Sequence, residues 1–435
     1  MRVITVVTIA AFVIAAMAMP SFAALTAGAG RADVTPDVKA MAPVVQGGYG
    51  ARMAKPAVGA HDPVYARALA ISDGEHRVCI VSMDLTGVPD NLDRDLVERL
   101  GKELGLDYGS LLISATHTHS SQGNMSPVPP LIAAIFGPYN QKLYEFVRDR
   151  TEQAVREAMT NMRPAEIGVA TTQLPGLNHN RRGEQGNTIT DDQMTVLYAH
   201  TPQGEPIGMA VFYTAHATVL DSDNFLISGD WPGAMERAIE FALPGVVAMH
   251  VNGAEGDQAP STKFGSTFAS VGFYGGALAE KAVGLAMSAP SQGEAKVMSA
   301  WEDFKLPKPE VSPAFMEVTG KEYHISKELA ESLASQVTVP SIPISVVRVD
   351  DLAIISMPGE AITEIGLELK KRAQAAGAKY AAIAGLAGRD VSYILTEEQY
   401  NKGGYEASMS FYGPRLGATV EDALTGLIKQ VEGKP

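Results

Sequence analysis

The chain has 435 residues, of which 46% are hydrophobic and 19% charged, and this is enough for a large buried core. The formal net charge of −14 argues against a nucleic-acid-binding protein and against docking on membranes through a polybasic surface. Cys79 is the only cysteine, so an intramolecular disulfide is excluded. Its apolar neighbours in residues 78–82 indicate that this thiol fills a buried strand.

The first residues have the pattern of a secretory signal peptide. Met1-Arg2 is followed by an apolar run over residues 3–19 and by the small residues Ser21 and Ala23. We expect residues 1–23 to be cleaved and residues 24–435 to form a single domain that is secreted or periplasmic. No later stretch is long and apolar enough to span a bilayer. An uncleaved anchor remains the alternative interpretation.

Hydrophobic periodicity predicts strands that alternate with helices after an irregular start over residues 27–56. We expect strands at residues 67–71, 78–82, 111–115, 167–170, 194–198, 209–214, 246–251, 297–304, 344–349, 353–356 and 381–383. We expect helices at residues 91–104, 144–162, 232–243, 268–287, 360–375 and 419–431. Residues 306–338 give the weakest pattern and are interpreted as a peripheral insertion. The alternation predicts an α/β fold with a mixed, largely buried sheet flanked by helices.

Two histidines, His117 and His119, follow the strand predicted at residues 111–115. Residues i and i+2 of an extended segment point to the same face, so both imidazoles are expected to converge. Ligands and metals collect beyond the carboxyl ends of strands in α/β proteins. The pair therefore indicates half of a metal site, although two histidines hydrogen-bonded in a turn would give the same pattern.

Other polar groups also follow predicted strands and are candidates to complete that site. His216 comes after the strand at residues 209–214, and Glu360 comes after the strand at residues 353–356 and a tight turn. Two histidines and one glutamate are a frequent ligand set of catalytic zinc, because they leave a position for water. A glutamate at a helix start also stabilises the helix dipole, so Glu360 alone does not decide between the two interpretations.

At these residues the sequence resembles the neutral/alkaline non-lysosomal ceramidase family. The resemblance rests on a series of short motifs that occur in the family's order through most of the chain. They are Gly28-x-Gly-x-Ala-Asp-Val-Thr35, Gly59-x-His61, Tyr65-Ala-Arg-Ala68, Ser114-x-Thr-His-Thr-His-Ser120, Asn178-His-Asn-Arg181, His216, Ile227-Ser-Gly-Asp230, Gly256-Asp257, Pro358-Gly-Glu360, Tyr393-x-x-Thr396-x-Glu398-x-Tyr400, Tyr405-Glu406-Ala407 and Tyr412-Gly-Pro414.

The resemblance implies a zinc-dependent hydrolase that cleaves the N-acyl amide of ceramide into sphingosine and a fatty acid, with one zinc ion per chain. The positions that match the family's zinc ligands are His117, His216, Glu360 and Tyr393. The positions that match its catalytic groups are His119, Arg181, Asp257 and Tyr393. His119, Arg181 and the Tyr393 phenol would hold the oxyanion, and either Asp257 or His119 would serve as the general base.

The chain departs from the family's pattern in its Gly-Asp loop. The loop reads Gly256-Asp-Gln-Ala-Pro-Ser261, so Ala259 stands where the family commonly has a serine. Zinc chemistry tolerates this change, because its nucleophile is a metal-activated water. The chain also ends soon after the region that resembles the hydrolase domain, so we expect no C-terminal β-sandwich module.

Two alternative functions follow from these departures. The first alternative to ceramide hydrolysis is a zinc amidase for another N-acyl lipid or amino compound. The second is a catalytically silent relative that binds lipid. An apolar run at residues 127–136 is interpreted either as a rim for a lipid tail or as a segment packed on the domain.

Overall fold

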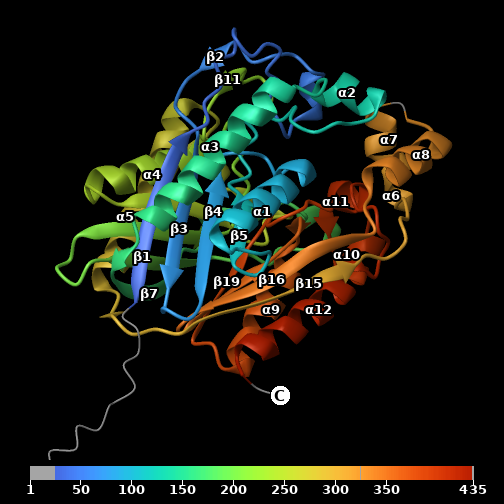
Figure 1. Ribbon diagram of the computed structural model, residues 1–435. Coiled ribbons are helices and arrows are strands. Elements are labelled where there is room, and N and C mark those ends of the chain that lie inside the picture. The colour runs from blue at the N-terminus through green and yellow to red at the C-terminus, as the bar shows by residue number, and fades with distance from the viewer. Residues whose placement is uncertain (1–24, 324, 434–435) are drawn as a thin grey trace, which may run out of the picture.

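The computed structural model describes residues 25–323 and 325–433. These residues form three large mixed β-sheets and three two-stranded sheets, and each large sheet is covered on its outer face by helices (Figure 1). The predicted α/β fold is confirmed, with three large sheets in place of one. Residues 1–23, expected to be a signal peptide, lie outside the described residues. Within the described ranges, no helix has the length and apolar character needed to cross a bilayer.

The first sheet shows a chain path that the other two repeat. Strands β1, β3 and β4 run antiparallel, helix α1 crosses over to β5 parallel to β4, and helix α3 then covers β1 and β3. The bounds are β1 (Thr26–Asp33), β3 (Tyr65–Ser72), β4 (Arg77–Met83), α1 (Asp90–Leu104), β5 (Leu111–Ala115) and α3 (Gln141–Thr160). We call residues 26–160 the first unit.

The second unit (residues 166–288) and the third unit (residues 297–431) follow the same path. The second consists of β7 (Glu166–Gln173), β9 (Gln193–His200), β10 (Pro206–Tyr213), α4 (Asp230–Ala242), β12 (Val247–Asn252) and α5 (Phe268–Ser288). The third consists of β15 (Val297–Lys305), β16 (Ser341–Val349), β17 (Leu352–Ser356), α9 (Thr363–Ala376), β19 (Tyr380–Ala384) and α12 (Leu416–Val431).

Short elements connect these units. The strands are β2 (Gly59–Ala60), β6 (Arg163–Pro164), β8 (Asn178–Asn180), β11 (Leu226–Ile227), β13 (Gln258–Pro260), β14 (Ser291–Gln292), β18 (Glu360–Ala361) and β20 (Tyr393–Ile394). The short helices are α2 (Pro130–Phe136), α6 (Pro313–Glu317), α7 (Thr319–Glu322), α8 (Lys327–Val337), α10 (Glu397–Asn401) and α11 (Gly404–Ser408), with 3-10 turns at Gly50–Arg52, Gly183–Gln185 and Thr262–Phe264.

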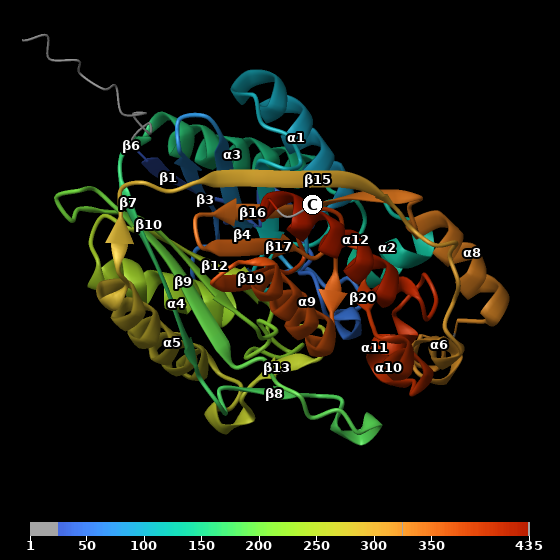
Figure 2. The same cartoon turned by 90° about the horizontal axis from the view of Figure 1, so that it is seen from below.

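The inner strands of each sheet are buried on both faces. In β10, Met209 and Val211 pack against the helices of the second unit, whereas Ala210 and Phe212 face a core shared by all three sheets. This alternation follows from the two-residue period of a strand. Burial on both faces explains why the strands read as almost continuous apolar runs. Figure 2 shows the three sheets from below, each with its own helices outside.

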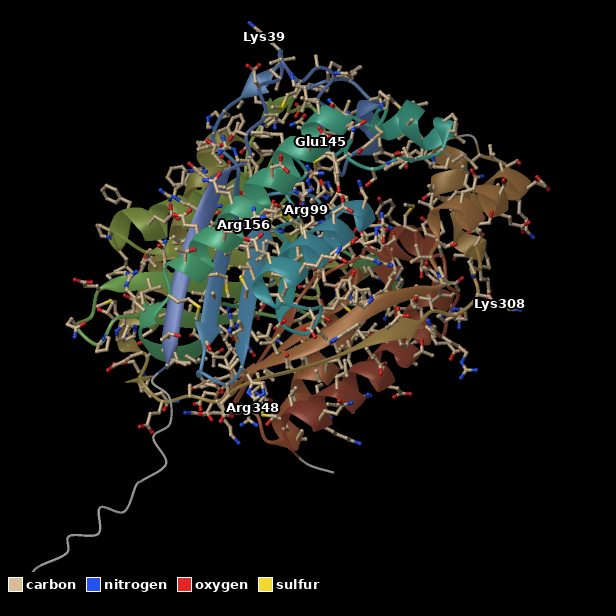
Figure 3. The ribbon with its side chains drawn as sticks, in the orientation of Figure 1. Lys39, Arg99, Glu145, Arg156, Lys308 and Arg348 are labelled. Atoms are coloured by element: carbon tan, nitrogen blue, oxygen red, sulfur yellow. The ribbon has the colours of Figure 1, made fainter. Side chains whose placement is uncertain are left out.

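Helices α1 and α3 lie side by side on the first sheet and are also linked by charges. Arg99 of α1 pairs with Glu152 of α3 at 2.6 Å, and Arg156 of α3 pairs with Glu103 of α1 at 2.8 Å; Figure 3 labels the two arginines. The two arginines are 48% and 39% exposed, so these ion pairs add little to stability compared with the apolar core beneath them.

The start of the described chain differs from the irregular segment expected from the sequence. Residues 26–33 form β1, which pairs along its full length with β3. Its glycines allow this, because a Cβ on Gly28 would lie 2.2 Å from the Ala158 carbonyl oxygen and one on Gly30 would lie 2.3 Å from that of Ala154. Gly and Ala have low β-propensity, so the sequence pattern did not predict this strand. Its small residues are required by the contact with α3.

Residues 306–338 are not merely peripheral. Helices α6 to α8 form a small apolar cluster in which Phe315, Ile325 and Leu333 are buried. Leu131 and Ile132 of α2 pack against this cluster, so the apolar run at residues 127–136 rests on the insertion (Figure 1).

We predict that Gly30→Ala lowers the free energy of unfolding by about 1–3 kcal/mol, because the added methyl group would displace the α3 backbone. Urea denaturation measures this change. Gly276→Ala in α5 is the control, since a Cβ there meets nothing within 4 Å and should be neutral or stabilising. Equal effects of the two substitutions would contradict the close packing of β1 on α3.

Candidate metal centre

The predicted site residues come from loops that follow the ends of parallel strands in all three units. His117 and His119 follow β5, His216 follows β10, and Glu360 follows β17. Because the three sheets share a core, the carboxyl ends of these strands meet at one place.

The two histidines of the His-x-His motif meet, but not as an extended strand would place them. β5 ends at Ala115, and His117 has a left-handed backbone with φ 67°. Their Nε2 atoms lie 3.2 Å apart. A positive φ at a residue that is not glycine is held by its surroundings and is frequent at functional sites. Gly48 makes room for His119, because a Cβ there would lie 2.3 Å from the imidazole.

Two small sheets fix the remaining groups. Glu360 of β18 pairs with Tyr393 of β20, which brings the carboxylate and the phenol to the same edge. Glu360 therefore lies before helix α9, which starts at Thr363, rather than in its first turn. β8 pairs with β13, and Arg181, directly after β8, donates its backbone N–H to the Asp257 carbonyl.

Three ligand-type atoms face one another at the centre. Glu360 Oε2 lies 3.4 Å from His117 Nε2 and 3.2 Å from His216 Nε2. Each Nδ1 contacts a backbone carbonyl, that of Thr86 for His117 and that of Glu255 for His216. An N–H on Nδ1 leaves a lone pair on each Nε2. Lone pairs at this separation repel unless a proton or a cation lies between them.

The electrostatics of the centre follow from burial and mutual contact. Burial alone would raise the pKa of Glu360, but the adjacent His117 and His216 outweigh it and lower that pKa well below its usual range. Burial and then the charges of Arg181 and His117 lower the pKa of His216 to about 4. Burial opposes a charge on His117, yet Glu360 raises its pKa to about 9. Burial, followed by the charges of the other two histidines, lowers the pKa of His119 well below its ordinary value.

The residues fit a divalent metal ion. Glu360 Oε2 and His119 Nδ1 are buried atoms without a hydrogen-bond partner. His117, His119 and His216 offer nitrogen atoms that all lie within 4.8 Å of one another. Two imidazoles and a carboxylate, with a phenol beside them, are donors that zinc takes in its catalytic sites.

Arg181 connects the centre to a buried ionic group. It donates to the Tyr393 hydroxyl at 2.8 Å, and its Nη1 lies 3.2 Å from His216 Nε2. Glu406 accepts from Arg181 Nε at 2.8 Å and from Arg182 at 2.6 Å. Glu406 therefore holds the guanidinium of Arg181 in place. Its motif was noted in the sequence, but no role was predicted for it.

Asp257 is the predicted site residue that the structure does not bring to the centre. Its Oδ1 accepts from the backbone and the hydroxyl of Thr363, and its Oδ2 accepts from Asn180 and Asn187. With both oxygens occupied, its carboxylate ties β8, β13 and the start of α9 together. The neighbouring Ala259 pairs with His179 in the β8–β13 sheet.

Glu255 was not predicted, although its Gly-rich loop follows a predicted strand. The side chain is fully buried, and neither carboxylate oxygen has a hydrogen-bond partner. Burial raises the pKa of Glu255 to about 8. The charge of His117 opposes this rise, and the charge of Glu360 adds to it. The apolar strand before residues 252–257 marked the loop as a candidate, but the resemblance pointed to Asp257 and not to Glu255 within it.

A cavity of about 600 Å³ opens onto the centre. His119, Arg181, His216 and Tyr393 contribute to its lining. The remaining lining side chains are mainly aromatic or polar, and include Tyr49, Thr218, Asp221, Ser261, Glu322, Tyr323 and Tyr405. Glu322 and Tyr323 belong to the insertion, which therefore forms part of the wall.

Comparisons with known proteins agree with this geometry. The sequence model of the family described as neutral/alkaline non-lysosomal ceramidase, N-terminal, matches residues 25–271. A neutral ceramidase from Pseudomonas aeruginosa is 24% identical, over 89% of this chain and 69% of its own. Neutral ceramidase 1 from Arabidopsis thaliana is 28% identical over 44% of this chain, and the match spans 26% of that relative.

Solved structures share the fold. The crystal structure of neutral ceramidase from Pseudomonas aeruginosa superposes with a TM-score of 0.79 at 22% identity, over 94% of this chain and 75% of that one. A structure described as ceramidase complexed with C2 gives the same TM-score at 21% identity, over 95% of this chain and 76% of that one. The likeness extends beyond residue 271, and so includes the third unit.

We predict that Glu406→Ala lowers the free energy of unfolding by about 3–5 kcal/mol, because it leaves the fully buried Arg182 without its anionic partner. Chemical denaturation monitored by circular dichroism measures the change. Glu398→Gln serves as the control, since it removes only an exposed pair with Lys402 and should act within about 0.5 kcal/mol. Similar small effects for both would show that Glu406 does not anchor the arginine pair.

Proposed function

This chain belongs to the neutral/alkaline non-lysosomal ceramidase family, and we propose that it is a zinc-dependent hydrolase that cleaves the N-acyl amide bond of ceramide. The observation that carries the proposal is the meeting of His117, His216 and Glu360 beside a cavity that the solvent reaches. Amide hydrolysis needs an activated water and stabilisation of negative charge on the carbonyl oxygen. The residues around the cavity supply both needs.

His117, His216 and Glu360 would hold the zinc ion, with the Tyr393 hydroxyl beside them. A bound zinc ion would lower the pKa of a coordinated water and polarise the amide carbonyl. The carbonyls of Thr86 and Glu255 fix the two imidazole rings, so their Nε2 atoms face the centre without further rearrangement.

We assign the general base to His119 rather than to Asp257. His119 lines the cavity and its Nε2 lies 3.2 Å from His117 Nε2 at the centre, whereas both oxygens of Asp257 are occupied. Its lowered pKa keeps the imidazole neutral, and a neutral imidazole can accept the proton of the attacking water. The same nitrogen then returns that proton to the leaving amine.

Arg181 and Tyr393 would stabilise the oxyanion. Both line the cavity, and both are in contact with each other at 2.8 Å. Glu406 and the Gly256 carbonyl hold the guanidinium from behind, so its orientation costs no reorganisation during the reaction. The scheme needs no hydroxyl at position 259, which suits a chain with Ala259.

A second candidate function is hydrolysis of a smaller, more polar N-acyl amine. The observation that favours it is the cavity lining, where Ala51, Val219 and Pro260 are the aliphatic residues among the side chains that the structure describes. Pockets for long hydrocarbon chains are lined mainly by apolar side chains. Comparing turnover of ceramide with that of short N-acyl amino compounds separates the two candidates.

We predict that purified protein releases the fatty acid from a fluorescent N-acyl sphingosine, that chelation abolishes this activity and that zinc restores it. His117→Ala should lose both bound zinc and activity, because it removes one of the three central ligands. His200→Ala is the matched control, since His200 ends strand β9 and its Nδ1 contacts the Thr201 carbonyl instead. Full activity after complete removal of zinc would refute the proposal.

We predict that Tyr393→Phe lowers kcat by about 10²–10³ while bound zinc is retained, because the change removes one oxyanion donor and leaves three ligands. Steady-state kinetics together with metal analysis measures both quantities. Tyr49→Phe provides a comparison within the same cavity, since the Tyr49 hydroxyl donates to the Leu220 carbonyl instead. An unchanged kcat in Tyr393→Phe would remove the phenol from the mechanism.

A further inference from the structure

Glu255 has no function in the scheme above, yet its surroundings are unusual for a carboxylate. It follows β12 in the second unit and is fully buried. Neither of its oxygens accepts a hydrogen bond, and within the described ranges no lysine or arginine forms an ion pair with it. An ionised carboxylate in this position costs several kcal/mol unless a positive charge lies against it.

The side chain points toward the same centre from a different side. Atoms of Glu255, Glu360 and His117 lie within 4.8 Å of one another, and this group shares His117 with the group of three histidines. The position opposite is glycine, and a Cβ on Gly385 would lie 2.7 Å from Glu255 Oε2. The same Cβ would lie 2.0 Å from the Gly253 carbonyl oxygen, so glycine at position 385 allows the chain to pack closely against this carboxylate.

This group shares Glu360 and His117 with the zinc ligands proposed above. The Nδ1 of His117 is engaged with the Thr86 carbonyl, and its Nε2 faces His216 and Glu360. The atoms left for another ion are therefore carboxylate oxygens of Glu255 and Glu360. A carboxylate can bridge two ions about 3.5–4 Å apart, as in two-metal hydrolases. Oxygen ligands suit hard cations such as magnesium or manganese.

We propose that Glu255 and Glu360 form a second divalent-cation site beside the zinc centre, with the Glu360 carboxylate shared between the two ions. This inference rests on the metal-dependent function proposed above. The second ion neutralises the buried charge of Glu255 and fixes the orientation of the Glu360 carboxylate. It is bound by oxygen atoms alone, so manganese is the appropriate probe.

The test is a count of bound metal in protein equilibrated with zinc and manganese and then freed of unbound ions. Wild-type protein should retain about two divalent ions per chain, and Glu255→Gln about one, with the loss in manganese. Asp93→Asn is the matched control, because Asp93 is also buried with an oxygen that lacks a hydrogen-bond partner, but belongs to neither ligand group. This variant should retain both ions.

The outcomes separate this inference from the proposed function. A single ion per chain in both wild type and Glu255→Gln would overturn the second site and leave the zinc centre standing. No bound ion in the wild type would overturn both. Glu255→Ala and a circular dichroism spectrum of each variant exclude unfolding as the cause of a loss. Paramagnetic resonance of bound manganese gives a readout independent of activity, and an unchanged signal in Glu255→Gln would also overturn the site.

Discussion

The contact of Glu360 with His117 and His216 is the interaction on which the rest of the site depends. Each of the three residues comes from a different unit, and their facing atoms lie 3.2–3.4 Å apart. Electron-rich atoms at this distance need a positive charge among them. The site therefore links the relative positions of the three sheets to the proton or cation held among these atoms, and a shift of one unit would open it.

The repeated chain path explains why this place exists. Each unit has three antiparallel strands, a crossover helix and a fourth strand parallel to the third. Such parallel pairs leave loops at their carboxyl ends, and these loops carry His117, His216 and Glu360. The sequence shows no repeat, because only the pattern of burial recurs in the three units, while the residues differ.

The sequence predicted the long elements and much of the site. The helix at α1 was clear because Leu92, Leu96 and Leu100 form one apolar stripe and Gly105 ends it. The strand β1 was not predicted, since its glycines are required by contact with α3 rather than by strand propensity. The contact of the insertion with α2 depends on distant residues, which periodicity does not reveal.

Some of the site residues could likewise be predicted from the sequence, and others could not. His117, His216 and Glu360 could be proposed because each follows an apolar strand and matches a motif. The engagement of Asp257 with Thr363, Asn180 and Asn187 depends on tertiary contacts and could not be predicted from spacing. Glu255 also follows an apolar strand, but only the folded chain shows that its carboxylate is buried beside Glu360.

The most direct test of the account is zinc K-edge X-ray absorption of the purified, zinc-loaded protein. The account predicts two or three imidazole nitrogens and at least one oxygen at about 2.0–2.2 Å from zinc, with imidazole scattering lost in part in His216→Ala. A zinc spectrum without imidazole scattering, or one unchanged in that variant, would contradict the assignment of His117, His216 and Glu360 as the metal centre.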